Sequence, residues 1–154
     1  LYAIGRAAYF AQGLETELLV AVLQIDGHKF HDDQIAYIQD HPAYKLSGGE
    51  LFSELRKRLK LTETQIATIR TGLTVRNEFV HHLWSEKRSS AFVSATGRAW
   101  LEQDILLIGA QIWKAVEEVQ ELRQSLGAEQ IARCALGKGR QAAIDQREVL
   151  MHLR

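Results

Sequence analysis

The fold is decided by residues 98–126, which form the longest helical pattern in the chain and have the sequence RAWLEQDILLIGAQIWKAVEEVQELRQSL. Apolar residues recur here at steps of three and four, the spacing that gathers side chains on one face of a helix. They are Leu101, Ile105, Ile108, Ile112, Val116, Val119 and Leu122. We predict that this helix forms the centre of a helical bundle and that Gly127 ends it.

A second helix is predicted over residues 2–25, where the same spacing of apolar residues recurs. The series consists of Ala3, Ala7, Phe10, Leu14, Leu18, Ala21 and Ile25. Asp26 and Gly27 follow the series directly, and this pair is expected to end the helix.

Two capping boxes predict helices in the middle of the chain. Ser47 with Glu50, and Thr62 with Gln65, have the spacing at which two side chains satisfy free main-chain N–H groups of a first helical turn. We therefore expect helices over residues 50–59 and about 62–83. The apolar side of the later helix is expected to contain Ile66, Ile69, Leu73, Val80 and Trp84.

Three segments have weaker patterns. Residues 28–49 predict a long connector that contains the only proline, Pro42, and a short helix over 33–39. Residues 85–97 predict either a loop or a brief hairpin. After Gly127, two amphipathic pieces, Ala128 to Leu136 and Gln141 to Leu153, are separated by Gly137-Lys138-Gly139, and they would cap the bundle or bind a partner. Together the patterns predict a compact four- to five-helix all-α bundle.

The composition narrows the class of protein. With 154 residues, the chain is predicted to form a single domain, 1–154, and 46% hydrophobic and 25% charged residues are ordinary globular values. Nineteen basic and nineteen acidic residues give no general attraction to nucleic acid or to an anionic membrane. No stretch is long and apolar enough to span a bilayer. Cys134 is the only cysteine, which is typical of a reducing compartment, so a cytoplasmic location is expected. A catalytic role for its thiol is not expected.

The predicted helix over 62–83 contains the sequence Arg-Asn-Glu-Phe-Val-His at residues 76–81. A histidine, with an ordinary pKa of about 6.5, suits proton transfer near neutral pH. A permanently charged guanidinium suits the binding of a phosphate or of negative charge that develops in a reaction. We therefore assign proton transfer to His81 and charge stabilisation to Arg76. Five helical residues rotate by about 140°, so the two side chains would flank one groove.

In this helical setting the residues Arg76, Asn77 and His81 resemble the motif of the HEPN family, an Arg, a polar residue such as Asn, and a His a few residues later. The resemblance implies a HEPN-type bundle over most of the chain, whose first helix lines the cleft with the motif helix. It implies a metal-independent endoribonuclease without a cofactor, in which RNA is cleaved through its own 2′-hydroxyl, His81 transfers protons and Arg76 stabilises the phosphorane that forms. It also implies a homodimer in which two motifs face one groove. It also implies a toxin with an antitoxin or other regulatory partner, or a protein of antiviral defence. The alternative is a non-catalytic HEPN bundle that binds a protein or nucleotide.

Several residues are expected to support this site. Asn77 lies one helical turn before His81 and would bind a phosphate or orient the imidazole. His82 also fits the spacing of the motif, and Gln12 and Glu15 of the first helix would support the motif if the two helices pack together. Lys87, Arg88 and Arg98 are candidates for contacts with RNA phosphates.

Simpler interpretations stand beside each of these. Arg76 and His81 would otherwise be a surface ion-pairing arginine and a histidine at a helix end. A polar cluster in the connector consists of His28, His31, Asp32 and Asp33. It is expected to be a solvated loop rather than a metal site, so no metal is expected. Trp84, Trp100 and Trp113 favour the core or a dimer face over a base-stacking surface.

Overall fold

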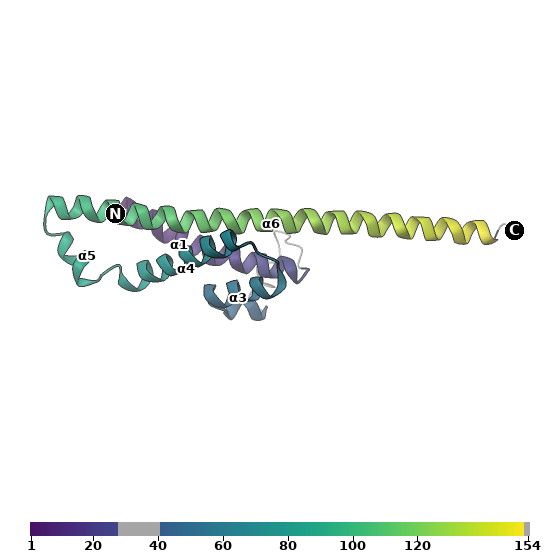
Figure 1. Cartoon of the computed structure of the whole chain (residues 1–154), viewed down its shortest axis with the longest axis horizontal. Coiled ribbons are helices and arrows are strands. Elements are labelled where there is room, and N and C mark those ends of the chain that lie inside the picture. Colours follow the sequence, from purple (N-terminus) through teal and green to yellow (C-terminus); the bar gives the residue numbers. More distant parts are fainter. Residues whose placement is uncertain (28–40, 153–154) are drawn as a thin grey trace.

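The computed structural model describes residues 1–27 and 41–152, with side chains as far as residue 128. In these ranges the chain is an all-α bundle, which confirms the predicted fold class. Figure 1 shows the arrangement: helix α6 (Ala95–His152) is the long axis, and α1 (Tyr2–Ile25) runs beside its first half. The predicted helix over 33–39 and the polar cluster from His28 to Asp33 lie outside the described residues.

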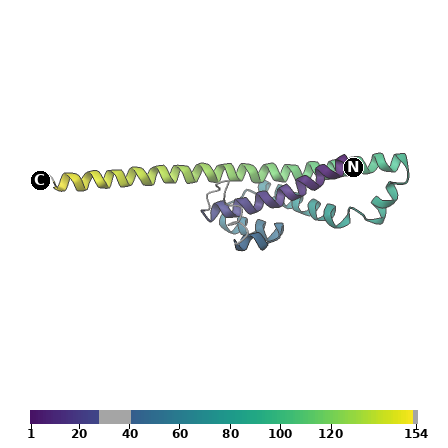
Figure 2. The ribbon, with the colours of Figure 1, turned by 180° about the vertical axis from the view of Figure 1, so that it is seen from behind.

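The remaining elements cover the other side of this helix pair. A 3-10 helix, η1 (Pro42–Lys45), leads into α3 (Gly48–Arg58), and α4 (Glu63–His82) then runs back along α6. A short helix, α5 (Glu86–Ala91), joins α4 to the start of α6. The view from behind shows α1 lying along α6 with α3 and α4 beyond it (Figure 2).

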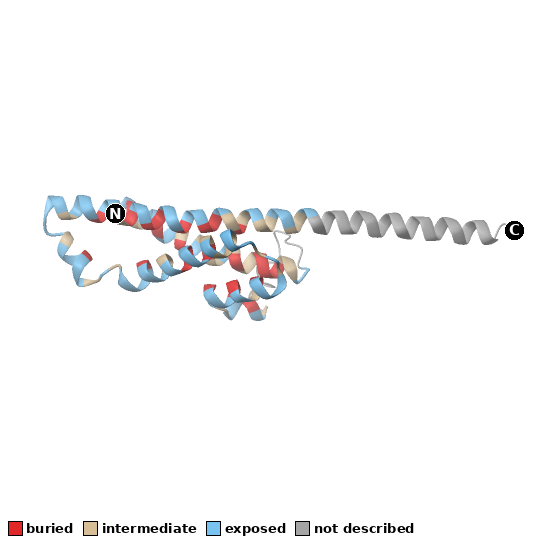
Figure 3. Cartoon of the chain, viewed as in Figure 1, coloured by how far each residue is buried: buried red, intermediate tan, exposed pale blue. Residues whose placement is uncertain are grey.

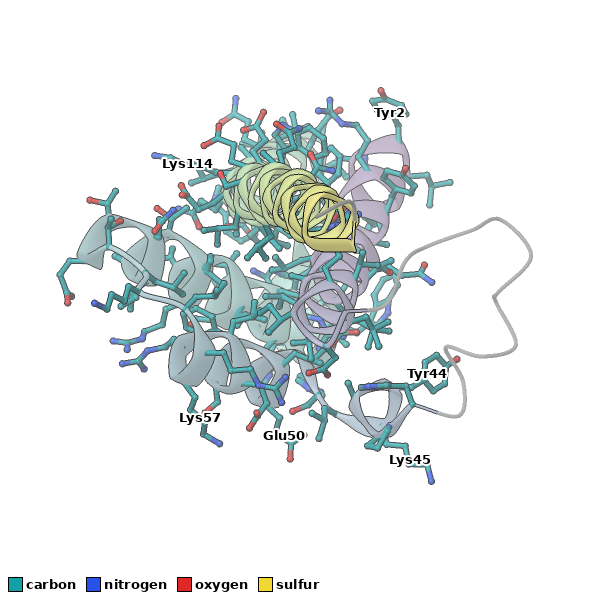
Figure 4. All side chains as sticks on the ribbon, turned by 90° about the vertical axis from the view of Figure 1, so that its right-hand side faces the viewer. Tyr2, Tyr44, Lys45, Glu50, Lys57 and Lys114 are labelled. Carbon is teal, nitrogen blue, oxygen red and sulfur yellow. The ribbon has the colours of Figure 1, made fainter. Side chains whose placement is uncertain are left out.

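The core forms where the predicted apolar faces meet. All six predicted residues of α6 from Leu101 to Val119 are buried, and Leu122 packs against them. In α1 small residues at Ala3, Ala7 and Ala11 are buried, and they let its backbone come close to α6. The buried positions therefore line the inner sides of the helices in Figure 3, while labelled side chains such as Tyr2 and Lys114 point outward in Figure 4.

The helix ends follow their predicted signals in three places. Ser47 and Glu50 form the capping box of α3, and Thr62 and Gln65 form that of α4. At the end of α1, Gly27 has a φ of 81°, the left-handed conformation that glycine adopts without strain. The expected starts and stops of these helices are thus confirmed to within two residues.

The expected end of the long helix at Gly127 is wrong, because α6 continues to His152. Gly127 has no positive φ, so it does not form the left-handed turn that ends α1. A helical glycine costs only about 1 kcal/mol, and good helix formers stand on both sides of it. The Gly137-Lys138-Gly139 break is wrong for the same reason. No other described helix lies beside the last part of α6 (Figure 1).

The loop or hairpin predicted over 85–97 is also wrong, since this segment contains α5 and the first turn of α6. Phe92 and Val93 alternate with polar residues as a strand would, but they form the turn between the two helices. In α4, Phe79 takes the buried position that was expected for Val80, which is 48% exposed. The hairpin prediction thus mistook a helix-connecting turn for a strand, and the predicted apolar side of α4 was displaced by one residue at Val80.

Candidate functional site

Arg76 occupies an interior position of α4. The buried residues Ile69, Gly72, Leu73 and Phe79 define the inner side of the helix, and a residue at 76 continues this side at steps of three and four. The side chain of Arg76 is accordingly only 19% exposed. A charged group is costly at such a position unless it is paired, so its partners decide what it can do.

Glu15 of α1 and the neighbouring Asn77 are the partners of Arg76. The guanidinium Nη2 lies 2.7 Å from Glu15 Oε1, and Nη1 donates a hydrogen bond of 3.0 Å to Asn77 Oδ1. The buried Nε–H has no hydrogen-bond partner. Since a guanidinium has five N–H donors, Arg76 keeps donors for a further acceptor while Glu15 fixes its orientation.

Gly48 at the start of α3 makes room for Glu15. A Cβ atom built on Gly48 would lie 3.0 Å from a methyl carbon of Leu73 and 3.4 Å from Cγ of Glu15. Gly48 is buried, so the side chain of Glu15 runs between α3 and α4 to reach Arg76. Three helices, α1, α3 and α4, therefore position one ion pair.

His81 and His82 lie in the last turn of α4, and both are exposed. Arg76 faces α1, whereas His81 is about 140° further round the helix. Among the described side chains no hydrogen bond joins Asn77 to His81, and Asn77 accepts one from Arg76 instead. Within one chain the site thus has an oriented guanidinium and a free imidazole on different sides of α4.

Arg88 was expected to contact RNA phosphate, and this expectation is contradicted because only 6% of the residue is exposed. Its Nε donates to Asp104 Oδ2 (3.0 Å), its Nη1 to the main-chain oxygen of His82 (3.1 Å) and its Nη2 to Glu78 Oε1 (3.4 Å). These bonds hold α5 and the end of α4 against α6. No local sequence pattern distinguishes this buried arginine from its exposed neighbours.

The other predicted basic contacts are exposed. Lys87 Nζ lies 5.0 Å from the centre of the Trp100 ring, and Arg98 Nη1 donates to the main-chain oxygen of Phe92 (2.9 Å). Gln12, also expected near the motif, is exposed, and only its main-chain oxygen has a described bond, from Thr16. Of the two expected supports on α1, Glu15 contacts Arg76 and the Gln12 side chain does not.

The three tryptophans do not lie in the core. Trp84 is 68% exposed, while Trp100 and Trp113 are each 38% exposed, so the core interpretation is wrong for all three. Trp113 packs against Phe10 with ring centres 4.9 Å apart, and Trp84 stacks on Phe92. Their exposed rings leave contact surfaces for another molecule.

In the described part of the chain, no helix has the length and apolarity required to cross a bilayer. No group of three or more His, Cys, Asp and Glu side chains is arranged there to hold a metal ion.

Comparison of the chain with protein-family models, curated proteins and solved structures gives no significant match. The likeness to the HEPN family therefore rests on the motif and on its place in a helical bundle.

Proposed function

We propose that the chain is a metal-independent endoribonuclease of the HEPN type, with Arg76 and His81 as its catalytic residues. One observation supports this most: an arginine at an interior position of α4 is oriented by Glu15, keeps N–H donors beyond its bonds to Glu15 and Asn77, and precedes an exposed histidine by five residues.

In the proposed reaction the 2′-hydroxyl of RNA attacks the adjacent phosphorus, and the bond to the 5′-oxygen of the next nucleotide breaks. Arg76 stabilises the added negative charge of the phosphorane, and Asn77 helps to position the phosphate. His81 transfers a proton to or from the reacting oxygens, with His82 beside it as a supporting group.

A second copy would complete the site. Because His81 and its neighbour His82 lie together in the last turn of α4, one chain presents proton-transfer groups to only one side of a phosphate. Two copies whose α4 ends face a shared groove would supply both a base and an acid. Exposed apolar residues of α6, Trp100 and Leu107 (61% exposed), offer surface for such an association.

The biological setting is part of the same proposal. A ribonuclease of this kind would act in the cytoplasm, as a toxin restrained by an antitoxin or other regulatory protein, or in antiviral defence. The lone cysteine supports the reducing compartment, and the last part of α6, which has no other described helix beside it in Figure 1, offers a site for the regulator.

Cleavage of RNA in the presence of a chelator tests the activity. The wild-type chain should cut single-stranded RNA, and the products should carry 2′,3′-cyclic phosphate. Arg76→Ala and His81→Ala should each reduce the rate at least about 100-fold. Arg70→Ala, an exposed arginine of the same helix, is the matched control and should retain the rate. Intact RNA with the wild-type chain, or full activity of His81→Ala, would refute the catalytic proposal.

A non-catalytic bundle that binds a protein or nucleotide is the second candidate. The equal numbers of acidic and basic residues favour it, because they give no broad affinity for RNA. Expression in cells separates the two: growth arrest by the wild-type chain but not by His81→Ala supports the ribonuclease, and equal effects of both chains support the binding module.

A further inference from the structure

Two aromatic rings are stacked on the surface just beyond the motif helix. Trp84 follows His81 by three residues and is 68% exposed, and Phe92 follows α5 and is 37% exposed. Their ring centres lie 5.8 Å apart with an angle of 25° between the planes. The pair presents a flat apolar surface that another molecule can cover by stacking.

The backbone on both sides of the pair is held in place. The hydroxyl of Ser89 donates to the main-chain oxygen of Trp84 (3.1 Å), and Arg98 donates to that of Phe92 (2.9 Å). Gly97 packs so closely on Ala91 that an added Cβ would lie under 3.0 Å from its backbone. The rings are therefore preorganised, and a ligand that stacks on them meets little entropic cost.

The surroundings combine apolar and cationic groups. Phe92 and Arg98 line one hollow of about 170 Å³, whose other lining residues include Leu1, Leu101 and Glu102. Arg98 is exposed, and its Nη1 donates to the main-chain oxygen of Phe92, so the guanidinium is fixed beside the pair and keeps further N–H donors that suit a phosphate attached to a stacked base. A ligand that is only flat and apolar would make no use of the positive charge of Arg98.

We propose that Trp84 and Phe92 form a stacking site for an unpaired base of single-stranded RNA, with Arg98 binding a neighbouring phosphate. This deepens the proposed ribonuclease function and rests on it for the identity of the ligand. Because Trp84 follows His81 by three residues, in the turn after α4, the stacked nucleotide is close along the strand to the bond that is cut. Base-paired RNA has no free base face and is a poor ligand for this site.

Binding is measured with the full chain carrying His81→Ala, in chelator, so that cleavage does not interfere. Fluorescence anisotropy of a labelled, unstructured RNA of about ten nucleotides reports affinity, and circular dichroism checks folding. Trp84→Ala should weaken binding about tenfold or more, and Trp84→Phe should restore most of it. Trp113→Ala removes an exposed tryptophan away from the site, on α6, and should leave the RNA affinity unchanged. A duplex of the same sequence should bind more weakly than the single strand.

Two results would overturn the site. Affinity that is unchanged in Trp84→Ala would show that no base stacks there. Loss of the dimer in sedimentation of Trp84→Ala, with equal RNA affinity per chain, would show that a second copy covers the rings. The outcome is separable from catalysis: RNA binding that depends on Trp84, without cleavage by the wild-type chain, supports the stacking site and refutes the ribonuclease.

Discussion

Gly72 of α4 lies directly against Ala115 of α6. A Cβ atom on Gly72 would be under 3.0 Å from Cβ of Ala115, a separation that real Cβ atoms essentially never show. This contact brings the motif helix close to the central helix, and both residues are buried. We predict that Gly72→Ala lowers the free energy of unfolding by about 1–3 kcal/mol through overpacking, as measured by urea denaturation.

Gly13→Ala is the matched control for this prediction. Nothing lies within 4 Å of a Cβ at Gly13, which is in the middle of α1. Since alanine is the better helix former, the control should raise the stability by about 0.5–1 kcal/mol. Equal effects of the two substitutions would mean that α4 and α6 are further apart than described.

Arg88 joins three elements, and its loss should destabilise the protein. Arg88→Met leaves Asp104 without this donor and removes one of the two donors to the main-chain oxygen of His82, where Ser85 N remains, at a cost of about 2 kcal/mol in the free energy of unfolding. Arg58→Met removes an exposed arginine paired with Asp26 and Glu54 and should cost less than about 1 kcal/mol. If both variants unfold at the same urea concentration, Arg88 does not hold α5 in place.

The sequence predicts most of the helices because their signals are local. The capping hydroxyls of Ser47 and Thr62 lie within three residues of the groups they bind, and the apolar spacing of α6 needs no partner to be recognised. The wrong predictions concern segments whose structure depends on contacts with distant residues, or on a residue that is compatible with two conformations. Gly127 is compatible with a helix or with its end, and α5 is fixed by Arg88 and Asp104, which are sixteen residues apart.

The candidate site was predicted less completely for a similar reason. The residue types at Arg76 and His81 indicated the chemistry, and packing of α1 against α4 was needed before Glu15 could be assigned to Arg76. The interior position of Arg76 can be read from the sequence, since it continues the side of Ile69 and Leu73, but its partner on α1 cannot.

Thr62→Ala should destabilise the motif helix at its start. The Thr62 hydroxyl accepts a hydrogen bond from Gln65 N (3.2 Å), and its removal costs about 1 kcal/mol in the free energy of unfolding. Thr71→Ala, at an exposed position within the same helix, should instead be slightly stabilising because alanine has the higher helix propensity. Thermal unfolding followed by circular dichroism measures both, and a Thr62→Ala protein as stable as the wild type would contradict the assigned cap.

Glu50 should make the stability depend on pH in the acid range. Hydrogen bonds from the main-chain N–H and then from the hydroxyl of Ser47 hold the pKa of Glu50 below its ordinary value. A folded-state pKa that is lowered gives stability that is present above the unfolded pKa and is lost as the pH falls through the folded one. Comparison of urea midpoints at about pH 7 and about pH 3 should therefore show a smaller acid loss for Glu50→Gln than for the wild type.

Ser47→Ala is the companion to this measurement. It removes the hydroxyl donor and keeps the main-chain donor at 2.7 Å, so its acid loss should lie between those of the wild type and Glu50→Gln. The same acid loss in all three proteins would show that the capping box does not contribute to the pH dependence.

Glu15→Gln tests whether the ion pair with Arg76 serves the proposed reaction. The carboxylate orients the guanidinium at 2.7 Å, and a neutral amide of the same shape holds it less firmly, so kcat for RNA cleavage should fall about tenfold while KM changes little. Glu17→Gln is the matched control, because Glu17 is two residues away on α1 and pairs with Arg123 and Gln120 of α6. It should lower stability without lowering kcat. A Glu15→Gln protein that loses stability but keeps full kcat would instead make Arg76 and Glu15 a structural pair and favour the non-catalytic bundle.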